Sequence, residues 1–259
     1  MIKMKQVHET PLVSVVIPVY NASKFIEETI QSVLKQTYQH FEIILVDDVS
    51  TDASVSIIRK MMATDKRISL LENDVNSGVA IARNRGVAAS TGRYICFLDA
   101  DDLWLPTKLE KQVAFTLNNG YAFTFTSYQF ADESGIALKP PLHVPGKISY
   151  QQALGNHTIF TSTVMLDLNQ LTKNDIEMPD VRRGQDTATW WKILKKTDYA
   201  YSIDEPLSIY RRTSASLSAN KFAAVKRTWN LFRNVEGLSL WQTIPPFCSY
   251  AINAIKRRL

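Results

Sequence analysis

The stretch LVSVVIPVY, Leu12 to Tyr20, is followed by a segment with helical spacing and then by FEIILVDD, Phe41 to Asp48. Both stretches are rich in Val and Ile and end in polar residues, which is typical of buried strands. The residues that recur at helical spacing between them are Ile26, Ile30, Val33 and Thr37, with Ser23 placed to cap the helix. This order predicts a β-α-β unit and therefore a parallel sheet with right-handed crossovers.

The same alternation continues along the chain, and it predicts an α/β fold with a mostly parallel, Rossmann-like sheet. The next predicted elements are a helix carrying Val55, Ile58 and Met62, a strand over 68–72, a helix over 79–89 and a strand over 93–99. The second half is less regular, with strands near 122–130 and 158–166, a helix near 186–195 and a strand pair near 199–212. Ligands of such sheets bind beyond the carboxyl ends of the strands.

Composition narrows the possible partners. The 259 residues are enough for one main domain, and a formal net charge of +5 favours anionic partners. Two cysteines argue against a disulfide framework or a thiolate metal site, and no apolar run is long enough to span a bilayer. We therefore expect a protein that is cytoplasmic or peripheral to a membrane. Because no nucleic-acid reader motif occurs, we expect no nucleic-acid partner.

The segment FLDADD, Phe97 to Asp102, carries the strongest chemical signal, because a hydrophobic strand delivers three carboxylates within four residues. Such crowding is unfavourable unless a cation relieves it, and Mg²⁺ or Mn²⁺ prefers hard oxygen ligands. Two other interpretations stay open here. Asp101 or Asp102 can cap the helix that begins near Pro106, or an aspartate can accept a phosphoryl group, as in a signalling receiver.

Polar groups follow the first two strands as well. A carboxylate of the pair Asp47-Asp48 can accept hydrogen bonds from a base or a ribose, although the pair also suits a solvated turn. Tyr20 can stack on a nucleobase or pack against the sheet edge. No glycine-rich phosphate loop occurs, so the charge of a diphosphate has to be neutralised by a metal and by cationic side chains. Arg83 is the best-placed cationic candidate, although it can also be a plain exposed arginine of a helix.

Four motifs together resemble the family 2 inverting glycosyltransferases of the GT-A fold: PVYN (18–21), VDDVSTD (46–52), NSGVAIARNRG (76–86) and FLDADD. The resemblance continues through RGQDTATWWKILKK (183–196) and YRRTSASLS (210–218), which are similar to bacterial surface-polysaccharide transferases of the capsule, O-antigen or teichuronic acid type. It implies a UDP-sugar site made of Pro18, Tyr20, Asp48, Asn76, Arg83, Asp99 and Asp101. Tyr20 and Asp48 are expected at the uracil, Asp99 at the ribose, and Asp101 with Asp99 at a Mn²⁺ or Mg²⁺ ion.

The resemblance also implies that Asp186 is the catalytic base, which removes the proton of the acceptor hydroxyl; a plain helix N-cap is the alternative. The sequence departs from the family pattern at Gln185, where a glutamate is usual, and at Val49, where a glycine is usual. The expected acceptor is a glycan linked to a polyprenyl diphosphate. A nucleotidyltransferase and a non-catalytic sugar-nucleotide-binding protein stay open as alternative functions.

The predicted catalytic domain covers residues 1–218, with a nucleotide-binding half over about 11–120 and an acceptor half over about 121–218. Residues 219–259 are predicted to form two helices broken by Pro245-Pro246. The first helix has an apolar face of Phe222, Val225, Trp229 and Phe232, surrounded by basic residues. Both helices either pack on the catalytic domain or rest on an anionic membrane surface, at the inner face of the cell membrane.

Overall fold

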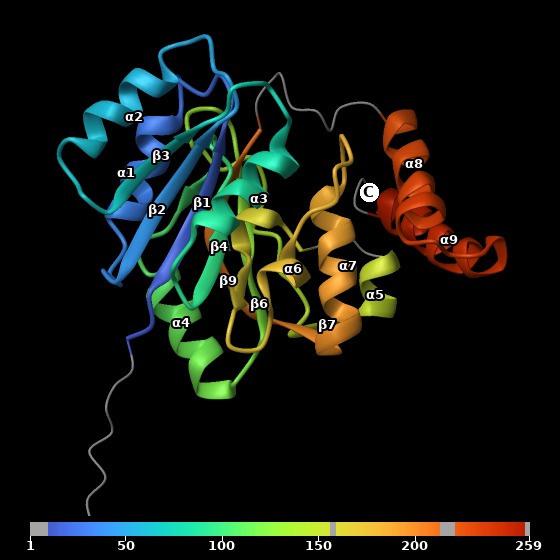
Figure 1. Cartoon of the computed structure of the whole chain (residues 1–259). Coiled ribbons are helices and arrows are strands. Elements are labelled where there is room, and N and C mark those ends of the chain that lie inside the picture. The colour runs from blue at the N-terminus through green and yellow to red at the C-terminus, as the bar shows by residue number, and fades with distance from the viewer. Residues whose placement is uncertain (1–9, 156–158, 213–220, 257–259) are drawn as a thin grey trace, which may run out of the picture.

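The computed structural model describes residues 10–155, 159–212 and 221–256, and it contains one nine-stranded mixed sheet (Figure 1). The first four main strands are β1 (Val13–Val19), β2 (Phe41–Asp47), β3 (Ile68–Glu72) and β4 (Tyr94–Phe97). They pair in parallel in the order β3-β2-β1-β4, so that their carboxyl ends meet at one edge. The α/β class and the parallel first half are therefore confirmed.

The second half of the sheet is mixed. The remaining strands are β5 (Leu103–Trp104), β6 (Phe123–Ala131), β7 (Lys147–Ser149), β8 (Met165–Asp167) and β9 (Tyr199–Arg211). β8 lies antiparallel between β4 and β6, whereas β6 and β9 pair in parallel. The sheet order β4-β8-β6-β9 brings the acceptor half of the sequence directly beside the first half.

Helices cover both faces of the sheet. One core contains apolar side chains of α1 (Ile26–Leu34), α2 (Ser54–Met62) and α4 (Lys108–Asn119). The other contains side chains of α3 (Val79–Ala89), α5 (Tyr150–Gly155), α6 (Lys173–Ile176) and α7 (Gln185–Thr197). β1 shows why the sequence gives two cores: Val15 and Ile17 belong to the first and Val16 to the second, because successive side chains of a strand point to opposite faces.

Gly86 permits the close contact between α3 and the sheet. A Cβ atom at this position would lie 2.4 Å from Cγ1 of Val16 and 3.3 Å from Cγ2 of Val46. Only a residue without a side chain lets the helix backbone approach β1 and β2 this closely. The helix that carries Arg83 is thereby held flat against the central strands.

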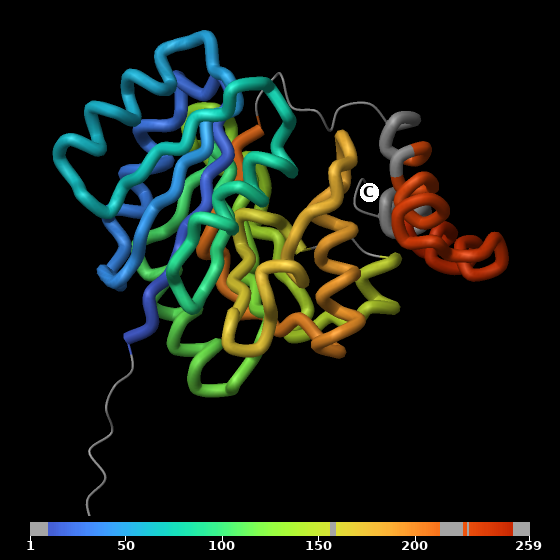
Figure 2. Tube along the Cα trace, in the orientation of Figure 1, coloured from blue at the N-terminus to red at the C-terminus, as the bar shows by residue number. Residues whose placement is uncertain are grey.

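The C-terminal helices form a hairpin beside α5 and α7 (Figure 2). α8 (Lys221–Asn230) continues into a π-helical turn (Leu231–Val235), and α9 (Leu240–Lys256) follows. Phe232 is fully buried and stacks on Trp191 of α7, with ring centroids 5.1 Å apart. The hairpin is thus joined to the catalytic core through this ring pair and through α9, which lies against α5. Among the described residues, no helix is both long and apolar enough to cross a membrane.

Several predicted elements were wrong in detail. The predicted strand over 158–166 is instead a 3₁₀ turn, η1 (Thr161–Thr163), followed by the short β8; residue 158 lies outside the described part of the chain. The predicted pair over 199–212 is the single strand β9, in which Pro206 coincides with a register shift opposite Ser127. Proline lacks the N–H that a regular ladder needs.

Helix boundaries also differ from those predicted. α1 begins after Phe25 without a side-chain cap, and the N–H of Ser23 donates instead to Asp52 Oδ2 at 2.9 Å. Pro245 and Pro246 lie inside α9 and do not break it. The reversal between the two C-terminal helices falls at Gly237, whose φ of 72° is readily adopted by a residue without a Cβ.

Candidate functional site

The loops after β1 and β2 form one side of the candidate site. Tyr20, directly after β1, is 56% exposed, and the N–H of Asp48 donates to Val19 O at 2.8 Å. Tyr20 and Asp48, the two predicted uracil contacts, are therefore neighbours. They lie at the edge of the sheet where the carboxyl ends of the parallel strands meet, which is called the ligand edge below. Pro18 lies inside β1, where it is buried and paired with Val46. Asn21, with a φ of 49°, accepts a hydrogen bond from the N–H of Thr51 at 2.8 Å and ties the two loops together.

Asp48 organises the segment that leads into α3. Its carboxylate accepts hydrogen bonds from Asn73 Nδ2 at 2.8 Å, from the N–H of Ser77 at 2.9 Å and from the N–H of Gly78 at 2.7 Å. The side chain of Asn76 donates to the backbone carbonyl of Asp48 at 2.8 Å. Because Asp48 is only 4% exposed, it fixes this loop from within.

Val49 stands where the resembling family usually has a glycine. Its φ of 67° lies in the left-handed region, which β-branched residues rarely adopt. The turn therefore keeps a conformation suited to glycine in spite of the valine side chain. Backbone strain of this kind is often found at functional sites.

The end of FLDADD, residues 99–102, is called the acidic segment below, and its three carboxylates have different environments. Asp99 forms an ion pair with the guanidinium of Arg83, which is 4% exposed. Asp102 is fully buried and accepts hydrogen bonds from Ser162 Oγ at 2.6 Å and from the N–H of Arg211 at 3.1 Å. Asp101 is partly exposed, and no described side chain donates to its carboxylate. The protein thus supplies an ion pair to Asp99 and hydrogen-bond donors to Asp102, but no described side-chain donor to Asp101.

Electrostatics separate the carboxylates further. Burial, together with the charge of Asp99, raises the pKa of Asp101 to about 6. Burial, followed by the charges of Asp99 and Asp101, raises the pKa of Asp102 well above its usual range. The positive charge of Arg211 works in the opposite direction on the pKa of Asp101. Asp101 therefore holds its negative charge at an energetic cost, which a nearby cation would reduce.

Asp186 lies in the first turn of α7, as predicted. Gly184 precedes the helix with a left-handed φ of 81°, and Thr161 Oγ1 donates to Asp186 Oδ2 at 3.1 Å. Trp190 fixes the helix against the sheet, with its ring 6.1 Å from that of Phe97 in β4. The carboxylate of Asp186 is partly exposed and hydrogen-bonded, which suits a group that accepts a proton from a substrate.

The turn η1 connects the two sides of the site. Ser162 Oγ donates to Asp102 and accepts from the N–H of Asp99 at 3.2 Å, while the neighbouring Thr161 donates to Asp186. Trp104 Nε1 donates to the carbonyl of Ser162 at 2.7 Å and holds the turn in place. Sequence reasoning missed Thr161 and Ser162, because isolated hydroxyl residues carry no distinctive pattern. Arg211 lies in the quoted motif YRRTSASLS, but no role was assigned to it. All the predicted residues except the buried Pro18 have a hydrogen bond, ion pair or exposed face at this edge.

Comparison with known proteins identifies the family. The model of the family "Glycosyl transferase family 2" matches residues 14–170. This chain belongs to that family. It is 43% identical over 249 residues to TuaG of Bacillus subtilis, a glycosyltransferase named for teichuronic acid biosynthesis, with 96% of this chain and 98% of that protein covered. It is 38% identical to WfgD of Escherichia coli, a UDP-Glc:α-D-GlcNAc-diphosphoundecaprenol β-1,3-glucosyltransferase, with 85% of each chain covered.

Solved structures support the fold. Staphylococcus aureus TarS residues 1–349, in complex with UDP-GlcNAc, superposes with a TM-score of 0.71 at 18% identity, covering 92% of this chain and 71% of that one. The mannosyltransferase PcManGT of Pyrobaculum calidifontis, in complex with GDP-Man and Mn²⁺, gives 0.69 at 19% identity, covering 94% and 70%. The GT-A fold and the glycosyltransferase assignment are therefore confirmed, and the nucleotidyltransferase interpretation is not supported.

The raised pKa of Asp101 predicts a stability effect in metal-free protein. Asp101→Asn removes a charge that the folded state holds unfavourably, so we expect it to increase the free energy of unfolding at pH 7.5 in EDTA. Since the folded pKa of about 6 exceeds the ordinary value of 3.8, the gain should be absent below about pH 4, develop as the pH rises to about 6 and then stay constant. Urea unfolding between pH 4 and pH 8 measures it. Equal stability of both proteins at pH 7.5 would contradict the cause given for the shift.

Proposed function

We propose that this glycosyltransferase transfers a sugar from a UDP-sugar donor to a hydroxyl of a glycan linked to a polyprenyl diphosphate. The observation that carries the proposal is the connection through η1 of the acidic segment to Asp186. WfgD and WfaP of Escherichia coli, both named as diphosphoundecaprenol-linked glucosyltransferases, support the acceptor class, at 38% and 35% identity. The TarS complex with UDP-GlcNAc supports the donor class.

The donor side is assigned to the loops after β1, β2 and β4. Tyr20 has the exposed ring needed to stack on uracil, and Asp48 orders the loop on which the base would rest. Asp99, fixed by Arg83, presents its second oxygen toward a ribose hydroxyl in this proposal. Asn76 acts through the carbonyl of Asp48 and has a positioning role.

The acidic segment fits a divalent cation that is shared with the donor. Among the described residues, no group of three or more potential ligands is arranged to hold a metal by itself. Mg²⁺ and Mn²⁺ sites that use one or two carboxylates together with substrate phosphates need no such group. Asp101 has the uncompensated carboxylate for this purpose, and Asp99 is the second candidate, although Arg83 already neutralises it. When bound, the ion would stabilise the charge that develops on the diphosphate.

Asp186 is assigned the role of general base. Its carboxylate accepts the proton of the acceptor hydroxyl while the oxygen of that hydroxyl bonds to the anomeric carbon and the bond to the UDP oxygen breaks. Thr161 Oγ1 donates a hydrogen bond to one carboxylate oxygen of Asp186, and the other oxygen accepts a hydrogen bond from the N–H of Thr187 at 2.7 Å. Single displacement from the face opposite UDP inverts the anomeric configuration.

One transfer assay tests the base and the metal together. UDP-glucose and an N-acetylglucosaminyl diphosphate carrying a short prenyl chain are the substrates, and the release of UDP and the product are both followed. Asp186→Asn is expected to lower kcat by about 10²–10⁴ without a change in the affinity for UDP. Asp101→Asn is expected to abolish the activity that Mn²⁺ restores to EDTA-treated wild type.

The control is Asp198→Asn, which removes an exposed carboxylate from the turn between α7 and β9, at the opposite edge of the sheet. A loss of less than about fivefold for Asp186→Asn would show that another group is the base. Nucleotide binding without any transfer in the wild type would favour the non-catalytic alternative. Full activity in EDTA would refute the proposed metal dependence.

We further propose that the C-terminal hairpin rests on an anionic membrane surface. The face of α9 that begins with Leu240, Trp241 and Ile244 is exposed, and Trp241 alone is 81% exposed. Of the apolar face predicted on α8, Phe232 is buried in the core, whereas Val225 is 46% exposed beside the exposed Lys226. One side of the hairpin therefore packs on the catalytic core, and the other side is exposed and available to a membrane surface. Residues 257–259, with the basic pair Arg257-Arg258, lie outside the described residues, as does the predicted boundary at Ser218.

Co-sedimentation with vesicles tests the membrane proposal. The double variant Trp241→Ser/Ile244→Ser should lose about tenfold in partitioning onto vesicles containing phosphatidylglycerol, because two apolar side chains no longer enter the interface. The matched control is Ile136→Ser, which removes an exposed apolar residue of the β6 region that is 66% exposed. Equal partitioning of all three proteins would leave the hairpin as a packed structural element only.

A further inference from the structure

The loop from Glu177 to Gly184 delivers Asp186 to the site and is anchored at its start. Met178 and Asn84 exchange two hydrogen bonds of 2.8 Å each, which fasten the loop to α3. Gly184 then turns the chain into α7. Figure 1 shows this loop at the same end of the molecule as the carboxyl ends of β1 and β2. The loop is therefore a fixed part of the ligand edge.

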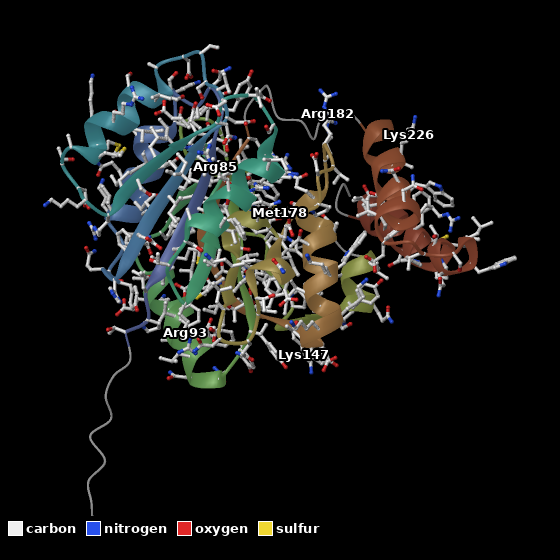
Figure 3. All side chains as sticks on the ribbon, viewed as in Figure 1. Arg85, Arg93, Lys147, Met178, Arg182 and Lys226 are labelled. Atoms are coloured by element: carbon white, nitrogen blue, oxygen red, sulfur yellow. The ribbon has the colours of Figure 1, made fainter. Side chains whose placement is uncertain are left out.

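Two adjacent arginines on this loop have no anionic partner. Arg182 is exposed and Arg183 partly exposed, and neither forms an ion pair or a side-chain hydrogen bond within the described part of the chain. Figure 3 shows Arg182 at the outer tip of the loop, pointing away from the sheet. By contrast, Arg83 is paired with Asp99 and Arg211 with Glu28, and Arg212 lies over the ring of Phe130. Cationic charge is thus concentrated, unneutralised, at the entrance to α7.

The nearby acidic groups do not account for this charge. Asp186 is hydrogen-bonded to Thr161 and to the N–H of Thr187, and Asp180 is exposed without an ion pair to either arginine. Adjacent like charges repel each other unless an anion bridges them. Guanidinium groups match the paired oxygens of phosphates, to which they donate two parallel hydrogen bonds. The chemistry of the pair therefore suits a diphosphate.

The position of the arginines favours the diphosphate of the acceptor over the diphosphate of the donor. Three residues of chain span at most about 10 Å, so Arg183 lies within about that distance of Asp186 along the backbone. In a sugar attached directly to a lipid diphosphate, the reacting hydroxyl and the diphosphate are separated by one sugar ring. In the proposed function, the donor diphosphate binds at the acidic segment, which η1 contacts through the hydrogen bond from Ser162 to Asp102.

We propose that Arg182 and Arg183 bind the diphosphate of the lipid-linked acceptor and thereby place the sugar hydroxyl at Asp186. This inference rests on the proposed function. It adds a specificity determinant: the enzyme distinguishes an acceptor sugar carried on a diphosphate from the same sugar carried on an uncharged group. Both arginines are binding residues and take no part in proton transfer.

Kinetics with two matched acceptors test the proposal. N-acetylglucosaminyl diphosphate and N-acetylglucosaminyl ether, each with the same short prenyl chain, are compared with UDP-glucose as donor. Arg182→Gln/Arg183→Gln should raise KM for the diphosphate acceptor about ten- to a hundredfold, on the scale of lost hydrogen bonds to a charged group. KM for the ether acceptor, KM for UDP-glucose and kcat should stay unchanged. Lys60→Gln, which removes an exposed charge on α2, is the control.

Direct binding makes the test independent of turnover. Geranyl diphosphate is titrated into the full chain saturated with UDP, and the affinity of the arginine double variant should fall about tenfold or more relative to wild type and to Lys60→Gln. Arg182→Lys/Arg183→Lys should recover part of it, since the charge is kept but the paired hydrogen bonds are not. Equal affinities, equal losses on both acceptors, or a raised KM for UDP-glucose would each overturn the assignment. Transfer to neither acceptor by wild type, with the difference in binding intact, would instead refute the proposed function.

Discussion

The hydrogen bond from Ser162 Oγ to the buried carboxylate of Asp102, 2.6 Å long, is the interaction on which the rest of the site depends. Asp102 has no solvent to stabilise it, so it needs donors from the protein. Those donors come from η1 and from the end of β9, two segments of the second half of the chain. Satisfying one buried carboxylate therefore fixes the second half against the end of β4. Thr161, on the same turn, donates a hydrogen bond to Asp186, so the position of Asp186 also depends on this turn.

This constraint also gives three sequence-adjacent carboxylates three different properties. Asp102 is committed to the fold, and Asp99 is neutralised by Arg83. Asp101 is left with a carboxylate that the protein does not compensate, and its pKa rises to about 6 through burial and the charge of Asp99. Proteins often keep such unfavourable electrostatics where a ligand supplies the missing charge. In the proposed function, the acidic segment is thus both a structural anchor and the place that would hold the cation of a metal–diphosphate complex.

The first half of the fold could be predicted from the sequence because its signals are local. Continuous Val and Ile runs marked β1 and β2, and spaced apolar residues marked α1 and α2. In the second half, β6 and α7 were also predicted, but β8 and β9 were not predicted correctly, because they depend on pairing with strands far away in the chain. Asp186 and Asp101 were found through motifs, whereas Ser162 and Thr161 were not, since a hydroxyl becomes informative only when the fold brings it to a carboxylate. Arg182 lies outside the quoted motifs and was likewise not singled out, because only the structure shows that it has no partner among the described residues.

The central claim is that Asp186 acts as a base on the acceptor side while the donor diphosphate leaves from the acidic side. η1 donates hydrogen bonds to Asp186 through Thr161 and to Asp102 of the acidic segment through Ser162, and we assign no protein carboxylate as a nucleophile. The most direct measurement is the anomeric configuration of the new bond, read from the proton coupling of the anomeric hydrogen after transfer from UDP-α-glucose. The account predicts a β-linked product from a single inversion. An α-linked product would contradict it, because retention needs a different use of these residues.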